Sequence, residues 1–113
     1  MKYLLLILII LSTGCSSIPH LSVYDEAKQN FIYIEDEADE WLVYDRIDEK
    51  FMGDCEDFAF TLQKQIGGEV WKVHVYGIWH AVLLKDGFVY DNIRRTPITR
   101  ESYRGWLIGK MAF

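Results

Sequence analysis

Residues 53–59 read GDCEDFA, and this stretch decides how the rest of the chain is interpreted. Asp54 is a favourable helix N-cap, and Glu56 and Asp57 suit a first helical turn. Apolar residues then recur at helical spacing as Phe58, Ala59, Leu62 and Ile66, before Gly67 and Gly68. The pattern predicts an amphipathic helix that begins at Cys55 and stops at the two glycines.

The position of Cys55 suggests a nucleophile. Free N–H groups and the macrodipole at a helix N-terminus favour a thiolate over a thiol. Cys55 also lies three residues before Phe58 on the same face. A buried core cysteine therefore explains this helix equally well. Whether Cys55 is a nucleophile depends on partner residues elsewhere in the chain.

The second half of the chain predicts an antiparallel sheet. Residues 70–76 alternate with a period of two, and residues 79–84 and 88–93 form two further apolar runs. Asp86 and Gly87 between the last two runs are typical of a two-residue hairpin turn. In that register Lys85 faces Phe88. The pairs Leu84–Val89, Val82–Asp91 and His80–Ile93 follow, and all six of these residues share one face.

The hairpin register makes His80 and Asp91 diagonal neighbours on that face. A carboxylate beside an imidazole fixes its tautomer and supports the imidazolium form. Taken singly, His80 could be a core histidine bonded to a backbone carbonyl. Asp91 could cap the loop at Asn92. Their joint placement favours a functional pair.

The other two histidines are less suited to this role. His74 has no acid in register and is expected to be structural or on the surface. His20 falls in an expected tether and has no predicted role.

Cys55, His80 and Asp91 would together supply a nucleophile, a base and an orienting acid. The Cys55 backbone N–H would help to stabilise the oxyanion of an acyl intermediate, whereas the sequence identifies no second donor. The predicted reaction is hydrolysis of a peptide or isopeptide bond.

The N-terminus has the features of an export signal. A positive start is followed by an apolar run from Leu4 to Leu11, too short to span a bilayer, and by small residues up to Cys15. The ending resembles a bacterial lipobox, although Ser12 stands where leucine is usual. We expect a signal peptide over residues 1–14, a lipidated tether over 15–22 with lipid on Cys15, and one domain over 23–113. Ser16 favours an outer-membrane anchor that faces the periplasm.

Lipidation of Cys15 would leave Cys55 as an unpaired thiol in an oxidising compartment, which suggests reactivity. The alternative is a Cys15–Cys55 disulfide in a chain that is not cut at Cys15. The formal charge of −5 argues against nucleic-acid binding. The expected partners are the membrane, through the lipid, and a substrate.

The remaining segments complete an α+β fold. Residues 23–30 predict a helix, 31–34 a short strand or extended link, and 36–52 an acidic segment prone to helix formation. Residues 96–110 either close the sheet or form a last short helix. The predicted architecture has N-terminal helices, with the Cys55 helix packed on a small antiparallel sheet.

Three blocks of the sequence resemble the bacterial transglutaminase-like cysteine proteinases: GDCEDFA, HAVL at residues 80–83 and YDNI at residues 90–93. The resemblance covers residues 39–93 and implies a papain-like core with Cys55, His80 and Asp91 as the catalytic triad. Catalysis of this type requires no cofactor. Some members bind calcium through the acids beside the cysteine, which implies calcium at Asp54 and Glu56. The chain is much shorter than typical members, so their substrates are not carried over.

The leading hypothesis is a lipid-anchored periplasmic cysteine peptidase acting on a protein or on a peptidoglycan peptide. A cell-wall peptidase similar to the NlpC/P60 group is an alternative. That group usually continues Ser-Gly where this chain has Glu56 and Asp57. A second alternative is a catalytically silent lipoprotein that binds or blocks a partner in the cell envelope.

Overall fold

The computed structural model of the protein describes residues 18–35 and 40–112. The expected signal peptide and Cys15 lie outside these residues. The first half contains α2 (Leu21–Asn30), β1 (Phe31–Tyr33), β2 (Phe51–Gly53) and α3 (Cys55–Ile66). The second half contains β3 (Glu69–Val75), β4 (Ile78–Lys85), β5 (Phe88–Tyr90), β6 (Ile98–Thr99), the 3-10 helix η1 (Arg100–Ser102) and β7 (Trp106–Met111). The predicted α+β class is confirmed.

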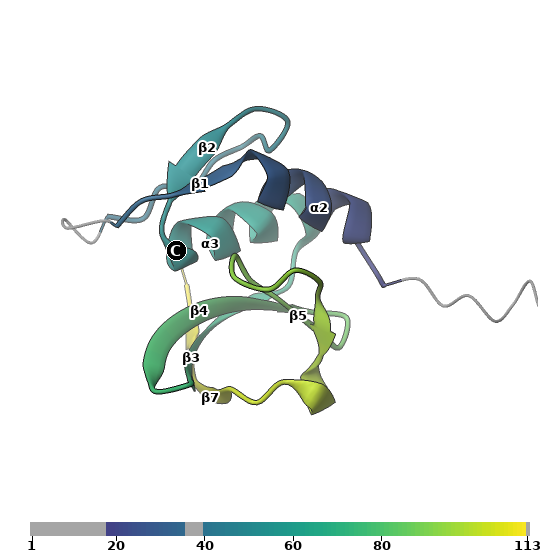
Figure 1. Ribbon diagram of the computed structural model, residues 1–113, viewed down its shortest axis with the longest axis vertical. Helices are drawn as coiled ribbons and strands as arrows, with labels where there is room; N and C mark the ends of the chain where they lie inside the picture. The colour runs from purple at the N-terminus through teal and green to yellow at the C-terminus, as the bar shows by residue number, and fades with distance from the viewer. Residues whose placement is uncertain (1–17, 36–39, 113) are drawn as a thin grey trace, which may run out of the picture.

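Two sheets enclose α3. Strands β1 and β2 form a parallel pair, and the larger sheet has the order β6-β5-β4-β3-β7 with antiparallel neighbours. Figure 1 shows α3 between the curved larger sheet on one side and α2 with β1 and β2 on the other. The predicted packing of the cysteine helix on a small antiparallel sheet is therefore observed.

Helix α3 begins and ends where its sequence predicts. The Asp57 N–H donates to Asp54 Oδ1 at 3.3 Å, and the Asp54 N–H donates to Asp57 Oδ2 at 2.9 Å. This reciprocal capping box satisfies two N–H groups that a helix start otherwise leaves open. At the other end Gly67 has a φ of 80° and its N–H donates to the Gln63 carbonyl. Such a positive φ is why glycine stops the helix here.

The predicted hairpin forms, but its ladder is shorter than expected. Asp86 and Gly87 both have positive φ, as a type I′ turn requires, and Lys85 pairs with Phe88 and Leu84 with Val89. The ladder ends at Tyr90, so the expected pairs Val82–Asp91 and His80–Ile93 are wrong. Asp91 Oδ1 accepts the N–H groups of Ile93 and Arg94, at 3.1 and 2.7 Å, and this turns the chain out of the strand.

The larger sheet is apolar on both faces. One hydrophobic cluster joins it to the helices and consists of Tyr24, Ala27, Ile47, Phe51, Phe58, Ala59, Phe60, Leu62, Val70, Ala81, Leu83 and Tyr90. A second cluster consists of Val73, Val75, Val82, Val89 and Tyr103. Because Ala81 and Leu83 belong to one cluster and Val82 to the other, β4 is buried on both sides and forms the centre of the fold.

The acidic segment before α3 differs from its prediction. Within its described part, residues 40–50 form no helix. The Leu42 N–H donates to Asp57 Oδ1 at 2.5 Å, and the Tyr44 N–H donates to Thr61 Oγ1 at 3.1 Å. Asp57 and Thr61 are fully buried on α3. These two side chains bind backbone groups that a helix would use internally, so tertiary bonding overrides the local propensity.

Both ends of the domain contact the sheet. Helix α2 begins at Leu21, two residues before its predicted start, and its cap residue His20 places Nε2 at 2.9 Å from Asp86 Oδ2. The Tyr90 hydroxyl donates to the Pro19 carbonyl. The expected tether over 15–22 thus ends earlier, and His20 has a structural contact that the sequence did not suggest. At the C-terminus β7 closes the sheet, one of the two expected outcomes. No helix within the described ranges is long and apolar enough to cross a bilayer.

Candidate active site

Three elements bring the predicted triad together. Cys55 is the first residue of α3, His80 lies in β4 and Asp91 directly follows β5. His80 Nε2 lies 3.0 Å from Asp91 Oδ2, and these two side chains are only 3% and 4% exposed. Cys55 lies close enough to His80 for its thiol to raise the pKa of the imidazole. The three residues that the sequence selected therefore form one connected cluster.

The two ring nitrogens of His80 have different partners. Because Nε2 is bonded to Asp91, Nδ1 is the nitrogen available to Cys55. Burial alone would lower the pKa of His80, but the hydrogen bonds to Asp91 and Cys55 and the charges on both residues raise it to about 9. The imidazole is therefore protonated at neutral pH, which is the form that stabilises a neighbouring thiolate.

Asp91 is held as a carboxylate by its surroundings. Burial would raise its pKa, yet the bond to His80 and the backbone N–H groups of Arg94 and Ile93 bring the pKa below its usual value. Asp91 Oδ2 is bonded to His80, while Oδ1 accepts hydrogen bonds from two backbone N–H groups. Asp91 is thus held in one position and is ionised at neutral pH.

Helix α2 supports the loop that carries Asp91. The buried Tyr24 hydroxyl lies 2.8 Å from the Asp91 carbonyl oxygen and is also within hydrogen-bond distance of the Arg94 carbonyl. Lys28 Nζ donates to the Asn92 carbonyl at 2.5 Å. Neither residue could be predicted for the site from the sequence, because no spacing rule connects a helix with a loop that follows it at such a separation.

A surface cleft of about 300 Å³ opens beside the triad. Its lining consists of Tyr33, Cys55, Ile78, Trp79, His80, Asn92 and Ile93. Cys55 is half-buried, so a ligand in the cleft can reach its sulfur. Asn92 Oδ1 is buried with no hydrogen-bond partner in the described part of the chain. His74, as predicted, lies outside the triad, and its ring contacts Trp79.

Tyr33 approaches the site from the smaller sheet. The parallel pairing of β1 and β2 places it opposite Gly53, two residues before Cys55. Burial, followed by the charges of Cys55, Glu35, Asp54 and Glu56, raises the pKa of Tyr33. The phenol therefore keeps its proton and offers an O–H donor in the cleft. In the sequence, the short apolar run that contains Tyr33 gave no sign of a functional role.

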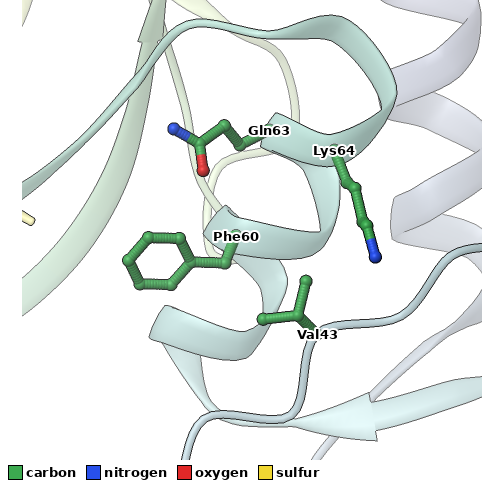
Figure 2. Close-up of a pocket in the computed structure, with 4 residues that line it drawn as sticks. All are labelled: Val43, Phe60, Gln63 and Lys64. Atoms are coloured by element: carbon green, nitrogen blue, oxygen red, sulfur yellow. The ribbon is translucent and has the colours of Figure 1, made fainter. Parts of the chain in front are cut away.

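A second depression lies away from the triad. Figure 2 shows it between α3, which contributes Phe60, Gln63 and Lys64, and the preceding segment, which contributes Val43. Its volume is about 330 Å³, similar to that of the cleft beside Cys55. It contains no nucleophile paired with a base, so it supplies no means of breaking a bond.

The acids beside Cys55 do not by themselves fit a calcium site. Calcium takes six to eight oxygen ligands, and Asp54 already accepts the Asp57 N–H in the capping box. Within residues 18–35 and 40–112, no three or more His, Cys, Asp and Glu side chains are grouped to hold a metal ion. Calcium at Asp54 and Glu56 stays a prediction of the resemblance.

Comparison of the chain with protein-family models, with curated proteins and with solved structures gave no significant match. The function is therefore inferred from the triad and its cleft. The resemblance to the transglutaminase-like cysteine proteinases rests on the residues quoted for it.

Proposed function

We propose that the protein is a thiol peptidase that hydrolyses an amide bond with Cys55, His80 and Asp91. The single observation that carries this proposal is the buried His80–Asp91 contact of 3.0 Å, whose imidazole lines an open cleft together with Cys55. A nucleophile, a base and an orienting acid in this order are the requirements for acyl transfer through a thioester.

The chemical steps follow from the protonation states. The Cys55 thiolate attacks the substrate carbonyl carbon, and the C–N bond breaks as the imidazolium gives its Nδ1 proton to the leaving amine. This leaves an acyl thioester and a neutral His80. His80 then takes a proton from a water molecule that attacks the thioester. The C–S bond breaks, the carboxylic acid product leaves and the thiolate–imidazolium pair is restored.

Two donors are available for the oxyanion. The Cys55 backbone N–H lies at the start of α3, where helix N–H groups lack intrahelical partners. We assign the second donor to the Tyr33 hydroxyl, because it lines the same cleft and interacts electrostatically with Cys55. Donors placed where negative charge develops stabilise the transition state more than the substrate.

The proposed location is the periplasmic face of the outer membrane, through lipid on Cys15. It is supported by the signal-like sequence of residues 1–15 and by the lone thiol of the described part, Cys55. Fractionation of cells that express the wild type and Cys15→Ala tests this proposal. Loss of membrane association in the variant is expected, and unchanged fractionation would contradict it.

A non-catalytic binding lipoprotein is the second candidate. It is favoured by β7, an edge strand that exposes 73% of Trp106 and 54% of Ile108 outside the cleft. Exposed apolar residues on an unpaired strand edge suit a protein partner. In that case Cys55 should react like an ordinary thiol.

Alkylation of Cys55 by iodoacetamide as a function of pH separates these candidates. Activated thiols have midpoints of roughly 3.5–7.5, compared with about 8.5 for a free cysteine. We expect alkylation of Cys55 at neutral pH to be faster in the wild type than in His80→Ala. His74→Ala is the matched control, since its ring lies near the cleft but outside the triad. A midpoint near that of a free cysteine in all three proteins would refute the peptidase proposal.

A further inference from the structure

We infer that the cleft beside Cys55 selects polypeptide segments that carry a large apolar side chain next to the scissile bond, and that Trp79 is the residue that recognises this side chain. The inference rests on the proposed function for the chemistry at Cys55. It adds the class of substrate and a residue that determines specificity.

The composition of the cleft wall supports an apolar ligand. Four of its residues are large, apolar in body and exposed: Tyr33 at 56%, Ile78 at 51%, Trp79 at 60% and Ile93 at 62%. They line the same cleft as the nucleophile and come from β1, β4 and the loop after β5. An exposed apolar group of this kind, continuous with a reactive side chain, is characteristic of a ligand site.

Trp79 is held in position before any ligand binds. Its ring centroid lies 4.9 Å from Lys72 Nζ and 4.9 Å from the centroid of the His74 ring, which is inclined to it by 59°. His74 is its direct partner across the β3–β4 ladder. An aromatic side chain fixed by neighbours loses little conformational freedom when it binds, so its contact area contributes efficiently to affinity.

Charge distinguishes a polypeptide from a cell-wall peptide in this cleft. The carboxylates of Glu35, Asp54 and Glu56 are close enough to Tyr33 to interact with it electrostatically. Like charges disfavour an acidic ligand at this end of the cleft. Peptidoglycan stem peptides combine free carboxylates with small side chains. The residues that line the cleft instead offer an apolar surface. The observations therefore favour a polypeptide substrate.

The experiment uses short, capped peptides of Ala, Ser and Gly with one central position set to Phe, Leu, Ala, Glu or Lys. Wild type, Trp79→Ala and Trp106→Ala are incubated with this mixture and, separately, with peptidoglycan fragments, and cleavage is followed by mass spectrometry. Trp106 is the matched control, because it is an exposed tryptophan that also pairs with His74 but does not line the cleft. Iodoacetamide alkylation of each variant verifies that the triad is intact.

We expect the wild type to prefer Phe and Leu peptides over the Ala peptide by about 10- to 100-fold in kcat/KM, the range that apolar pockets provide. Trp79→Ala should remove this preference without changing alkylation of Cys55. Trp106→Ala should retain it. Equal cleavage of all peptides, a preference that survives Trp79→Ala, or cleavage of peptidoglycan fragments in place of apolar peptides would overturn the inference.

A binding measurement keeps the inference separate from the proposed function. Calorimetric titration of Cys55→Ser with the Phe and Ala peptides measures selectivity without catalysis, and Cys55→Ser/Trp79→Ala should lose it. If the wild type cleaves nothing while binding still depends on Trp79, the peptidase proposal fails and the selectivity of the cleft stands. Equal binding of both peptides overturns the selectivity.

Discussion

The Tyr24 hydroxyl lies 2.8 Å from the carbonyl oxygen of Asp91, a residue 67 positions later in the chain. The backbone of the acid that orients His80 is thus fixed by a buried side chain of α2. Burial and the nearby Asp91 charge raise the pKa of Tyr24, so the phenol remains a donor at neutral pH. The N-terminal helix is therefore part of the support of the candidate active site.

Replacing Tyr24 with Phe should destabilise the domain and weaken its activity. The change leaves the carbonyls of Asp91 and Arg94 without this donor, and an unsatisfied buried group costs about 1–3 kcal/mol. A looser Asp91 loop should lower kcat more than it raises KM. Urea denaturation and peptide hydrolysis measure the two effects.

The matched control is Tyr44→Phe, which removes an exposed hydroxyl bond to the Met52 carbonyl. We expect it to change neither property appreciably. Equal effects of the two substitutions would show that Tyr24 has no special role in positioning Asp91.

The pKa of His80 makes stability depend on pH in a defined window. The pKa of about 9 in the folded state exceeds the 6.5 of an unperturbed histidine. The folded state therefore binds the proton more tightly than the unfolded state. The resulting stabilisation is complete below pH 6.5 and is lost as the pH rises through 9.

Asp91→Asn removes the negative charge that raises the pKa of His80. The free energy of unfolding of this variant should fall less steeply than that of the wild type between pH 6.5 and 9. Urea denaturation at several pH values measures the slope. Equal slopes in the two proteins would show that the His80–Asp91 pair does not cause the pH dependence of stability.

Gly53→Ala should disrupt the start of α3. A Cβ at this position would lie 2.3 Å from Asp57 Oδ2 and 2.5 Å from Asp57 Cβ. Asp57 cannot move away without losing its bonds to Asp54 and Leu42. We expect a loss of about 1–3 kcal/mol in the free energy of unfolding.

Gly109→Ala is the control for this substitution, since a Cβ there meets nothing within 4 Å. Its stability should change by less than about 0.5 kcal/mol. Thermal denaturation of the two variants side by side gives the comparison. A stable Gly53→Ala protein with an intact capping box would contradict the predicted clash.

Tyr33→Phe tests the second oxyanion donor. Loss of one such donor lowers kcat by roughly 10²–10³-fold in a characterised protease. Alkylation of Cys55 should be unaffected, because iodoacetamide forms no oxyanion. Tyr76→Phe, which changes a residue that is 81% exposed, should leave both rates unchanged. Full peptidase activity in Tyr33→Phe would remove Tyr33 from the mechanism.

Chelation tests the calcium prediction for Asp54 and Glu56. We expect EDTA to leave Cys55 alkylation and thermal stability unchanged, because Asp54 is already bonded within the capping box. A ligand that binds only the folded state raises its stability by RT ln(1 + [L]/Kd). A higher melting temperature in millimolar calcium that is lost in Glu56→Gln would establish the site instead.

The sequence by itself determined the elements whose signals are local. A capping residue, helical spacing and two glycines defined α3, and Asp86-Gly87 defined the hairpin that brings His80 towards Asp91. These predictions held because their interactions lie within a few residues of one another. Hydrogen bonding and backbone sterics at that range depend little on the rest of the fold.

Tertiary structure alone decided the features that depend on distant partners. Residues 40–50 form no helix because Asp57 and Thr61 of α3 accept the N–H groups of Leu42 and Tyr44, against the helical tendency of the segment. Tyr24 supports Asp91, and Tyr33 and Trp79 line the same cleft as Cys55, although no spacing in the chain links them. Such contacts form only when burial of the shared core brings separate elements together, and the free energy of that packing is not encoded in any short stretch of sequence.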